Sequence, residues 1–286
     1  MAPPTSILYH TVPVRDKNTN TLVRNGAQIT NPLKKVLSHM PKVPAWQDVV
    51  QALIHLVFPS GCASCQTPLW QTSIPFFCQS CWGKLSLLPE PYCPQCGRPF
   101  ASPVALTHSP THVCGACREH PPAFSKAWSV FAYQTPLKEA LALFKYRGKV
   151  TLAHPLARLL IQHLPSLPPV DVIMPVPLHA QRLREREFNQ SALLANPLSQ
   201  HLGLPLILGG LIRTRPTVPQ TSLTRKERLT NLRGAFSVSQ PVAIQGKAIL
   251  VIDDVMTTGT TLHECAHTLR QAGSGPVYGL TLARMV

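Results

Sequence analysis

The C-terminal two-thirds of the chain alternates between short apolar runs and longer segments with apolar residues at helical spacing. The apolar runs predict strands at 127–134, 170–177, 205–214, 247–255 and 277–284. Helical spacing predicts helices at 136–149, 152–164, 189–203, 223–236 and 260–273, with Pro197 expected to kink or break the third. Strands that alternate with helices are typical of a mostly parallel sheet with helices on both faces. The predicted fold class is therefore α/β.

The first 122 residues have a different pattern. Residues 1–45 mix Pro, Asn, Thr and Lys without periodicity and are interpreted as a mostly disordered basic tail. One amphipathic helix is predicted at 44–60, followed by a cysteine-rich stretch that ends at Cys117. We therefore divide the chain into a tail (1–45), a small module with a leading helix (46–122) and an α/β domain (123–286).

The net charge of +15 is unevenly distributed. The tail has six basic and one acidic residue, residues 46–122 have three of each, and residues 123–286 have 18 basic and eight acidic residues. A basic α/β domain suits polyphosphate ligands or nucleic acid, although a general solubility role explains the charge equally well. The sequence has no apolar run of about 18 residues and no signal-peptide pattern at its start, so we expect a cytoplasmic protein without membrane insertion.

Four Cys-x-x-Cys pairs lie in the small module, separated by 12, 11 and 17 residues. Two such pairs complete a tetrahedral thiolate site, so eight cysteines predict two structural Zn²⁺ sites with no open position for substrate. Consecutive pairs or alternating pairs could share an ion. Redox or iron–sulfur chemistry is the alternative, but redox pairs usually occur singly. The proposed ligands are Cys62, Cys65, Cys78, Cys81, Cys93, Cys96, Cys114 and Cys117. His108 and His112 are interpreted as loop residues, and Cys265 as a buried small residue.

The stretch VIDDVMTTGTT, residues 251–261, joins the most strand-like run to a helix. Asp253 and Asp254 stand at the carboxyl end of that strand, where α/β proteins bind ligands. Gly259 allows close backbone approach, and the amides of a helix start, with the hydroxyls of Thr257, Thr258, Thr260 and Thr261, would bind phosphate. Carboxylates repel phosphate but accept hydrogen bonds from vicinal hydroxyls. The pattern therefore predicts a phosphorylated ribose as ligand, with a divalent metal offsetting the charge.

This stretch resembles the phosphoribosyl-pyrophosphate (PRPP) signature of type I phosphoribosyltransferases. The resemblance implies that Asp253 and Asp254 contact the ribose hydroxyls, and that residues 257–261 hold the 5-phosphate. It also implies Mg²⁺ bound with PRPP, and displacement of pyrophosphate at the anomeric carbon if the protein is an enzyme.

Further segments extend the resemblance to the ComF/ComFC competence family, which pairs a double zinc ribbon with a phosphoribosyltransferase domain. A basic pyrophosphate loop would contain Pro177, Arg182 and Arg186, and a flexible hood would contain Arg213, Gln220, Arg225 and Arg228. Lys145 adds a further cation. The family usually has Arg-Gly-Phe-Asn-Gln where this chain has Arg186-Glu187-Phe188-Asn189-Gln190, and Pro197 is also atypical.

The resemblance implies a PRPP-binding protein that acts in DNA uptake and binds single-stranded DNA, with a competence helicase or other uptake protein as a further partner. Basic stretches at 182–186 and 213–233 would follow the DNA backbone, and Trp82 and Tyr92 would stack on bases. Two alternatives remain: an active phosphoribosyltransferase of unknown acceptor without a DNA role, and a zinc-ribbon docking protein with a degenerate PRPP site. The sequence does not decide whether catalysis occurs.

Overall fold

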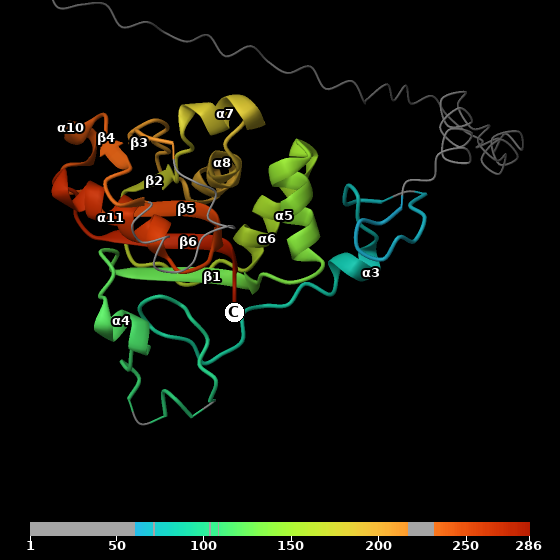
Figure 1. Ribbon diagram of the computed structural model, residues 1–286. Coiled ribbons are helices and arrows are strands. Elements are labelled where there is room, and N and C mark those ends of the chain that lie inside the picture. The colour runs from blue at the N-terminus through green and yellow to red at the C-terminus, as the bar shows by residue number, and fades with distance from the viewer. Residues whose placement is uncertain (1–60, 71, 103, 108, 217–231) are drawn as a thin grey trace, which may run out of the picture. The chain divides into compact units, whose positions relative to one another are not determined.

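The computed structural model describes residues 61–216 and 232–286, apart from positions 71, 103 and 108 (Figure 1). All of these residues belong to one compact unit, which comprises residues 52–286. The expected tail at 1–45, the helix expected at 44–60 and most of the helix expected at 223–236 lie outside the described residues.

A four-stranded parallel sheet forms the centre of this unit. Its order is β1 (Lys126–Ala132), β6 (Val277–Arg284), β5 (Ile249–Met256) and β2 (Val172–Pro175). All four strands lie where apolar runs predict them. In a parallel sheet the carboxyl ends of all strands lie at one edge, so the residues that follow β5 and β2 are brought to the same place.

The two faces of the sheet are covered by different helices. Leu250 and Ile252 of β5 lie in a core cluster with α5 (Leu137–Tyr146), α6 (Ala153–Gln162) and α8 (Gln190–Leu202), and η1 (Val150–Leu152) leads into α6. Ile249 and Val251, which point to the other face, lie in a second cluster with α11 (Thr260–Gln271). Cys265 of α11 is fully buried in that cluster, as predicted. The predicted α/β architecture, a parallel sheet between helices, is confirmed.

The strand expected at 205–214 is two separate pieces. Leu206 makes a single parallel bridge to Ile173 of β2, and β3 (Leu211–Arg213) pairs antiparallel with β4 (Phe236–Val238) in a second, two-stranded sheet. The break occurs at Gly209, whose φ of +74° turns the chain away from the main sheet. A short helix, α10 (Pro241–Ile244), connects β4 to β5.

Pro197 does not break helix α8. The helix runs from Gln190 to Leu202 through the proline, so the expectation of a break was wrong. The missing amide hydrogen of the proline removes one hydrogen bond from the helix. Leu194, Ala195 and Leu198 are fully buried against the sheet, and this tertiary packing holds the helix continuous on both sides of the proline.

Besides α10, three short helices of the described residues lie outside the predicted set. α7 (Ala180–Arg186) follows β2, where the sequence suggested a loop, and none of its residues is buried. α3 (Gln79–Trp82) and α4 (Gly115–Glu119) each begin directly after a cysteine of the small module. Among the described residues, no helix combines the length and the apolar character needed to cross a membrane.

Candidate functional site

The eight paired cysteines form two separate clusters. One contains Cys62, Cys65, Cys78 and Cys81, and the other contains Cys93, Cys96, Cys114 and Cys117; the sulfur atoms of each cluster lie within 4.8 Å of one another. Consecutive pairs therefore share a cluster, which settles the pairing that the sequence left open. His112, beside the second cluster, is exposed and packs against Phe100, and His108 lies outside the described residues.

The geometry of both clusters fits zinc. A tetrahedral site with Zn–S bonds of about 2.3 Å has sulfur–sulfur edges of about 3.8 Å. The Sγ atoms of Cys65 and Cys78 are 3.7 Å apart, as are those of Cys96 and Cys114. The amides of Cys78 and Cys114 also point toward the sulfur atoms of their clusters, at 3.4 and 3.3 Å. Because all four positions are cysteines, such sites are structural.

Asp253 and Asp254 lie near the carboxyl end of β5 and have different partners. Asp253 Oδ1 accepts hydrogen bonds from the hydroxyl of Ser191 and from the amide of Asp254, both at 2.9 Å. Burial raises the pKa of Asp253, opposed by the attraction of Lys145. Asp254 is 3% exposed, and its Oδ2 forms an ion pair with Nζ of Lys145 at 2.6 Å.

Lys145 comes from the last turn of α5 and was named from the sequence only as an additional cation. Burial lowers its pKa to about 8, against the attraction of Asp253 and with the repulsion of Arg186 as a smaller cause. Ser191, in the first turn of α8, was not predicted at all. No local pattern marks either residue, because each is far from β5 in the sequence.

Residues 257–261, called here the Thr/Gly turn, follow β5 directly and include the first residues of α11. Gly259 has a φ of +85° and is the N-cap of α11, and a Cβ atom built there would lie 2.7 Å from the methyl group of Met256. Both the backbone conformation and the close contact therefore require glycine. The hydroxyls of Thr258 and Thr260 are 2.8 Å apart, so these two side chains face each other across the turn.

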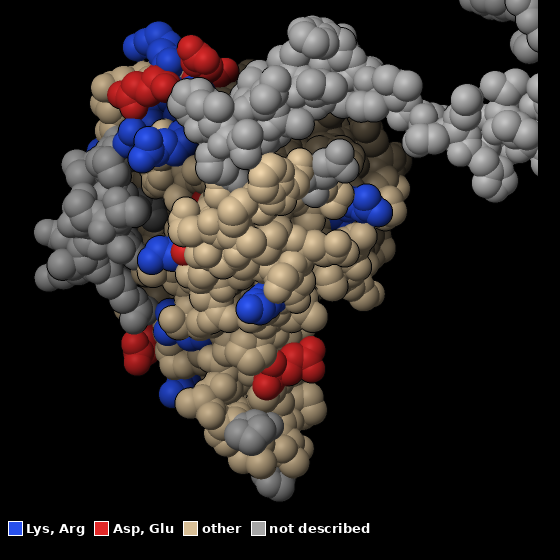
Figure 2. Space-filling view, turned by 90° about the vertical axis from the view of Figure 1, so that its right-hand side faces the viewer, with Lys and Arg blue, Asp and Glu red and all other residues tan. Residues whose placement is uncertain are grey.

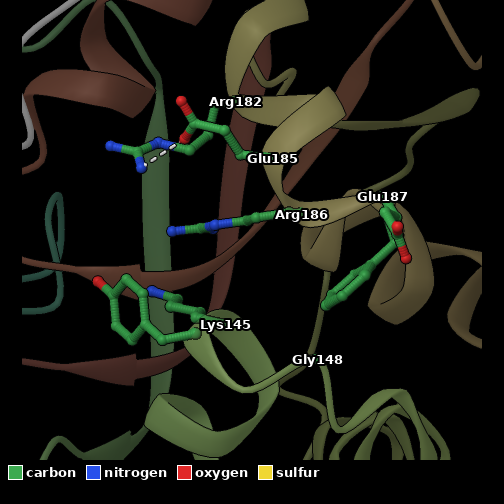
Figure 3. A pocket seen from close by; sticks show the side chains of 8 residues that line it. Lys145, Gly148, Arg182, Glu185, Arg186 and Glu187 are labelled. Atoms are coloured by element: carbon green, nitrogen blue, oxygen red, sulfur yellow. Dashed lines mark hydrogen bonds and ion pairs between the residues drawn. The ribbon is translucent and has the colours of Figure 1, made fainter.

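Arg182 and Arg186 both lie on α7, and Pro177 precedes this helix. The two arginines, with Lys145 and Tyr146, line a pocket of about 280 Å³. Figure 3 shows the side chains of the two arginines and Lys145 extending toward the same side of the pocket. Arg182 is paired with Glu185 at 2.9 Å, and the guanidinium of Arg186 lies 5.2 Å from the ring centre of Tyr146. These three cations provide a place for an anionic group beside the acids of β5.

Glu187 takes the position where the resembling family usually has glycine, and it ends α7 with a φ of +66°. This left-handed conformation costs a residue with a side chain about 1 kcal/mol or more. A carboxylate at this position would bring negative charge near the proposed pyrophosphate loop. In Figure 3 the side chain is directed away from Arg182, Arg186 and Lys145, although Glu187 is among the residues that line the pocket.

Arg213 is the last residue of β3 and lies in a strand rather than in a loop. Its guanidinium is 5.6 Å from the ring centre of Phe236, and burial lowers its pKa. The other residues of the expected hood, Gln220, Arg225 and Arg228, lie outside the described residues.

Two family models match the chain. The model "Double zinc ribbon domain" matches residues 53–121, which contain both cysteine clusters. The model "Phosphoribosyl transferase domain" matches residues 189–277, which contain α8, β5 and the Thr/Gly turn.

Three relatives cover most of the chain. DNA utilization protein YhgH of Salmonella typhi is 34% identical over 80% of this chain and 99% of its own length. Competence protein F of Haemophilus influenzae is 32% identical over 72% of this chain and 90% of its own length. Competence protein ComFC of Bacillus subtilis is 30% identical over 72% and 83%. The chain belongs to the ComF/ComFC family, in which a double zinc ribbon is joined to a phosphoribosyltransferase-like domain.

Proposed function

We propose that this protein binds PRPP together with Mg²⁺ at the carboxyl edge of its parallel sheet. Asp253 and Asp254 would accept hydrogen bonds from the ribose hydroxyls, and residues 257–261 would bind the 5-phosphate. The pyrophosphate would lie toward Arg182, Arg186 and Lys145, with Mg²⁺ held mainly by its oxygens. The observation that carries the proposal is the placing of the buried Asp254, the partly buried Asp253, three cations and the Thr/Gly turn at one edge of the sheet.

Calorimetric titration with PRPP and Mg²⁺ tests this proposal. Asp253→Asn keeps the shape of the side chain but weakens its acceptor strength, so we expect binding to weaken at least tenfold, and the variant with both aspartates replaced should show no binding. Asp171→Asn is the matched control. Asp171 is exposed, is far from the Thr/Gly turn in the sequence, and accepts a hydrogen bond from the amide of Ala248. Unchanged affinity in a folded Asp253→Asn protein would refute the site assignment.

If ribose transfer occurs, the bond between the anomeric carbon and pyrophosphate breaks and a bond to the acceptor forms. The transition state would resemble an oxocarbenium ion, so holding the ribose and pyrophosphate in place matters more than any single base. Mg²⁺, if bound with PRPP, would stabilise the charge on the leaving pyrophosphate. A pyrophosphate-release assay across candidate acceptors, with and without single-stranded DNA, separates an active transferase from a protein that only binds PRPP.

The role in DNA uptake is supported by relatives named for DNA utilization and competence. On the face in Figure 2, the described Lys and Arg side chains are spread among uncharged residues, with acidic side chains at the upper end and in the lower part. We assign DNA contact to the basic stretches at 182–186 and 213–233, the second of which contains Arg225, Lys226 and Arg228. Charge removal at these three positions should weaken single-stranded DNA binding and flatten its salt dependence. A salt-independent affinity in the parent protein would exclude this electrostatic model.

Aromatic side chains of the zinc module would stack on bases. Trp82 and Tyr92 are partly buried, and Trp82 packs against Phe77 at 5.5 Å. Trp70 is 63% exposed and is a better placed third candidate. Trp70→Ala should reduce DNA affinity more than Trp82→Ala. If none of the three aromatic residues affects DNA binding, the zinc ribbons instead serve as a docking surface for another uptake protein.

A further inference from the structure

Arg284 is a fully buried arginine at the end of the last strand. It is 1% exposed and is the largest of the fully buried side chains among the residues that the structure describes. Nη1 donates a hydrogen bond to the carbonyl oxygen of Cys96 at 2.7 Å, and Nη2 lies 3.9 Å from the sulfur of the same cysteine. A buried guanidinium is always charged, so it requires a compensating anion nearby.

No carboxylate provides that anion among residues 61–216 and 232–286. The ion pairs within this part of the chain are Lys145–Asp254 and Arg182–Glu185. The nearest group that can carry negative charge is instead the sulfur of Cys96 in the second cluster, 3.9 Å from Nη2. A buried arginine whose polar partners all belong to a cysteine cluster or a thioether is unusual for a protein core.

The second cluster, when it holds zinc, has a net negative charge that is stabilised by a nearby cation. Four thiolates and one Zn²⁺ have a net charge of −2, and all four cysteines of this cluster are at most 8% exposed. The first cluster differs, because Cys65 is exposed and Cys78 is partly exposed to water. We propose that Arg284 is the counter-charge of the second zinc ribbon and a positioning residue that joins it to the phosphate-binding turn.

The second ribbon is also attached to the sheet by its backbone. The carbonyl of Gln95 accepts a hydrogen bond from the amide of Ala127 in β1, at 2.8 Å. A Cβ atom at Gly97 would lie 3.0 Å from the carbonyl oxygen of Ala127. The turn that contains Cys96 and Gly97 therefore lies directly on strand β1. Arg284 is therefore buried between the ribbon and the sheet rather than at the edge of a separate module.

Arg284 reaches the phosphate-binding turn through Met256. Nη1 of Arg284 is 2.9 Å from the sulfur of Met256, and the methyl group of Met256 lies against Gly259. When zinc leaves the second cluster, the buried thiolates take up protons from water and become neutral thiols. The guanidinium is then without its anion, so it must move or admit water. When Arg284 moves, Met256 loses its contact with the guanidinium. The Met256 methyl group is then no longer held against Gly259 in the Thr/Gly turn. The first cluster has no comparable connection to this turn among the described residues.

The test uses the full chain with both zinc sites filled. A chromogenic chelator removes zinc, and cysteine alkylation read by mass spectrometry identifies which cluster has opened. Arg284→Met removes the charge, Arg284→Lys keeps it, and Arg118→Met is the control, since Arg118 is exposed and directly follows Cys117. We expect Arg284→Met to release zinc from the second cluster about 10- to 100-fold faster, with Arg284→Lys intermediate and Arg118→Met unchanged. Equal acceleration at both clusters, no acceleration, or identical behaviour of the methionine and lysine variants would overturn the counter-charge role.

A second measurement on the unmodified protein does not depend on the folding of any variant. Hydrogen exchange of the amides at 256–262 is followed while the chelator acts. Exchange should increase in step with alkylation of the second cluster and not with that of the first. Exchange that follows the first cluster, or that does not change after the second has opened, would disprove the connection. Neither readout involves PRPP, so failure here is distinct from failure of the proposed function.

Discussion

The ion pair between Lys145 and Asp254 allows a quantitative test of the candidate site. At a separation of 2.6 Å and an effective dielectric constant of about 20, the attraction between the two charges is about 6 kcal/mol. The pKa of Lys145 nevertheless falls from 10.5 to about 8. Burial and the neighbouring charges together therefore disfavour the ammonium by about 3 kcal/mol. The pair is therefore held together strongly but contributes little net stability.

This balance predicts strong coupling in a double-mutant cycle. Lys145→Met and Asp254→Asn each leave one buried partner uncompensated, and each should lower the free energy of unfolding by about 3 kcal/mol. The double variant removes both charges, so it should lose no more than either single variant, which gives a coupling energy of about 3 kcal/mol. Urea unfolding followed by circular dichroism, with zinc kept saturating, measures all four proteins.

The exposed pair Arg182–Glu185 is the internal control for this cycle. Its two side chains are 39% and 46% exposed, so its coupling energy should be below about 1 kcal/mol. If the losses at Lys145 and Asp254 are simply additive, the buried ion pair does not exist in solution and the reasoning is refuted.

The coupling should also depend on pH. Lys145 is charged below its folded pKa of about 8, so the full coupling is present at pH 7 and is lost as the pH rises through 8 to 9. In the unfolded chain this lysine has its ordinary pKa of 10.5. Between pH 8 and 10.5 the unfolded chain therefore binds more protons at Lys145 than the folded protein does. Lys145 therefore makes folding more favourable between pH 8 and 10.5 as the pH increases. A coupling energy that is unchanged at pH 9.5 would contradict this assignment of the proton.

Three further predictions concern the backbone and the metals. Glu187→Gly should raise the free energy of unfolding by about 0.5–1 kcal/mol, because it relieves a left-handed residue, whereas Glu185→Gly within α7 should lower it by about 1 kcal/mol; urea midpoints distinguish the two. Gly259→Ala should destabilise the fold by more than Gly148→Ala and should abolish PRPP binding. Both glycines have positive φ, but only Gly259 is in contact with Met256. Urea unfolding and PRPP calorimetry of the two variants test this. Metal analysis should return about two zinc ions per chain, and iron, or no metal in a folded reduced sample, would contradict the tetrathiolate sites.

Local sequence patterns were sufficient for the parts of the molecule that local physics determines. β5 is buried on both faces, so its run of apolar residues is unbroken and easily recognised. The Thr/Gly turn follows it without a gap. The cysteine spacing predicted two four-cysteine clusters, although it left open which pairs share a cluster. Pattern reading failed where no face is buried: α7 has no buried residue, and its sequence therefore lacks apolar spacing. It also failed at 205–214, because the positive φ of Gly209 cannot be read from an apolar run.

The partners of the two aspartates show why the site itself could be predicted only in part. Asp253 is hydrogen-bonded to Ser191, and Asp254 is paired with Lys145, and both partners are more than 60 residues away in the sequence. The sheet order brings them together, since α8 packs on β5 and α5 lies on the same face. The sequence thus predicted groups that we propose contact a ligand, but it did not predict which groups neutralise and orient them. Ribose hydroxyls would have to replace Lys145 at Asp254, and the released ammonium would then face the pyrophosphate beside Arg186. The same cation can therefore stabilise the empty site and the filled one, which makes Lys145 the residue whose removal should affect both stability and PRPP affinity.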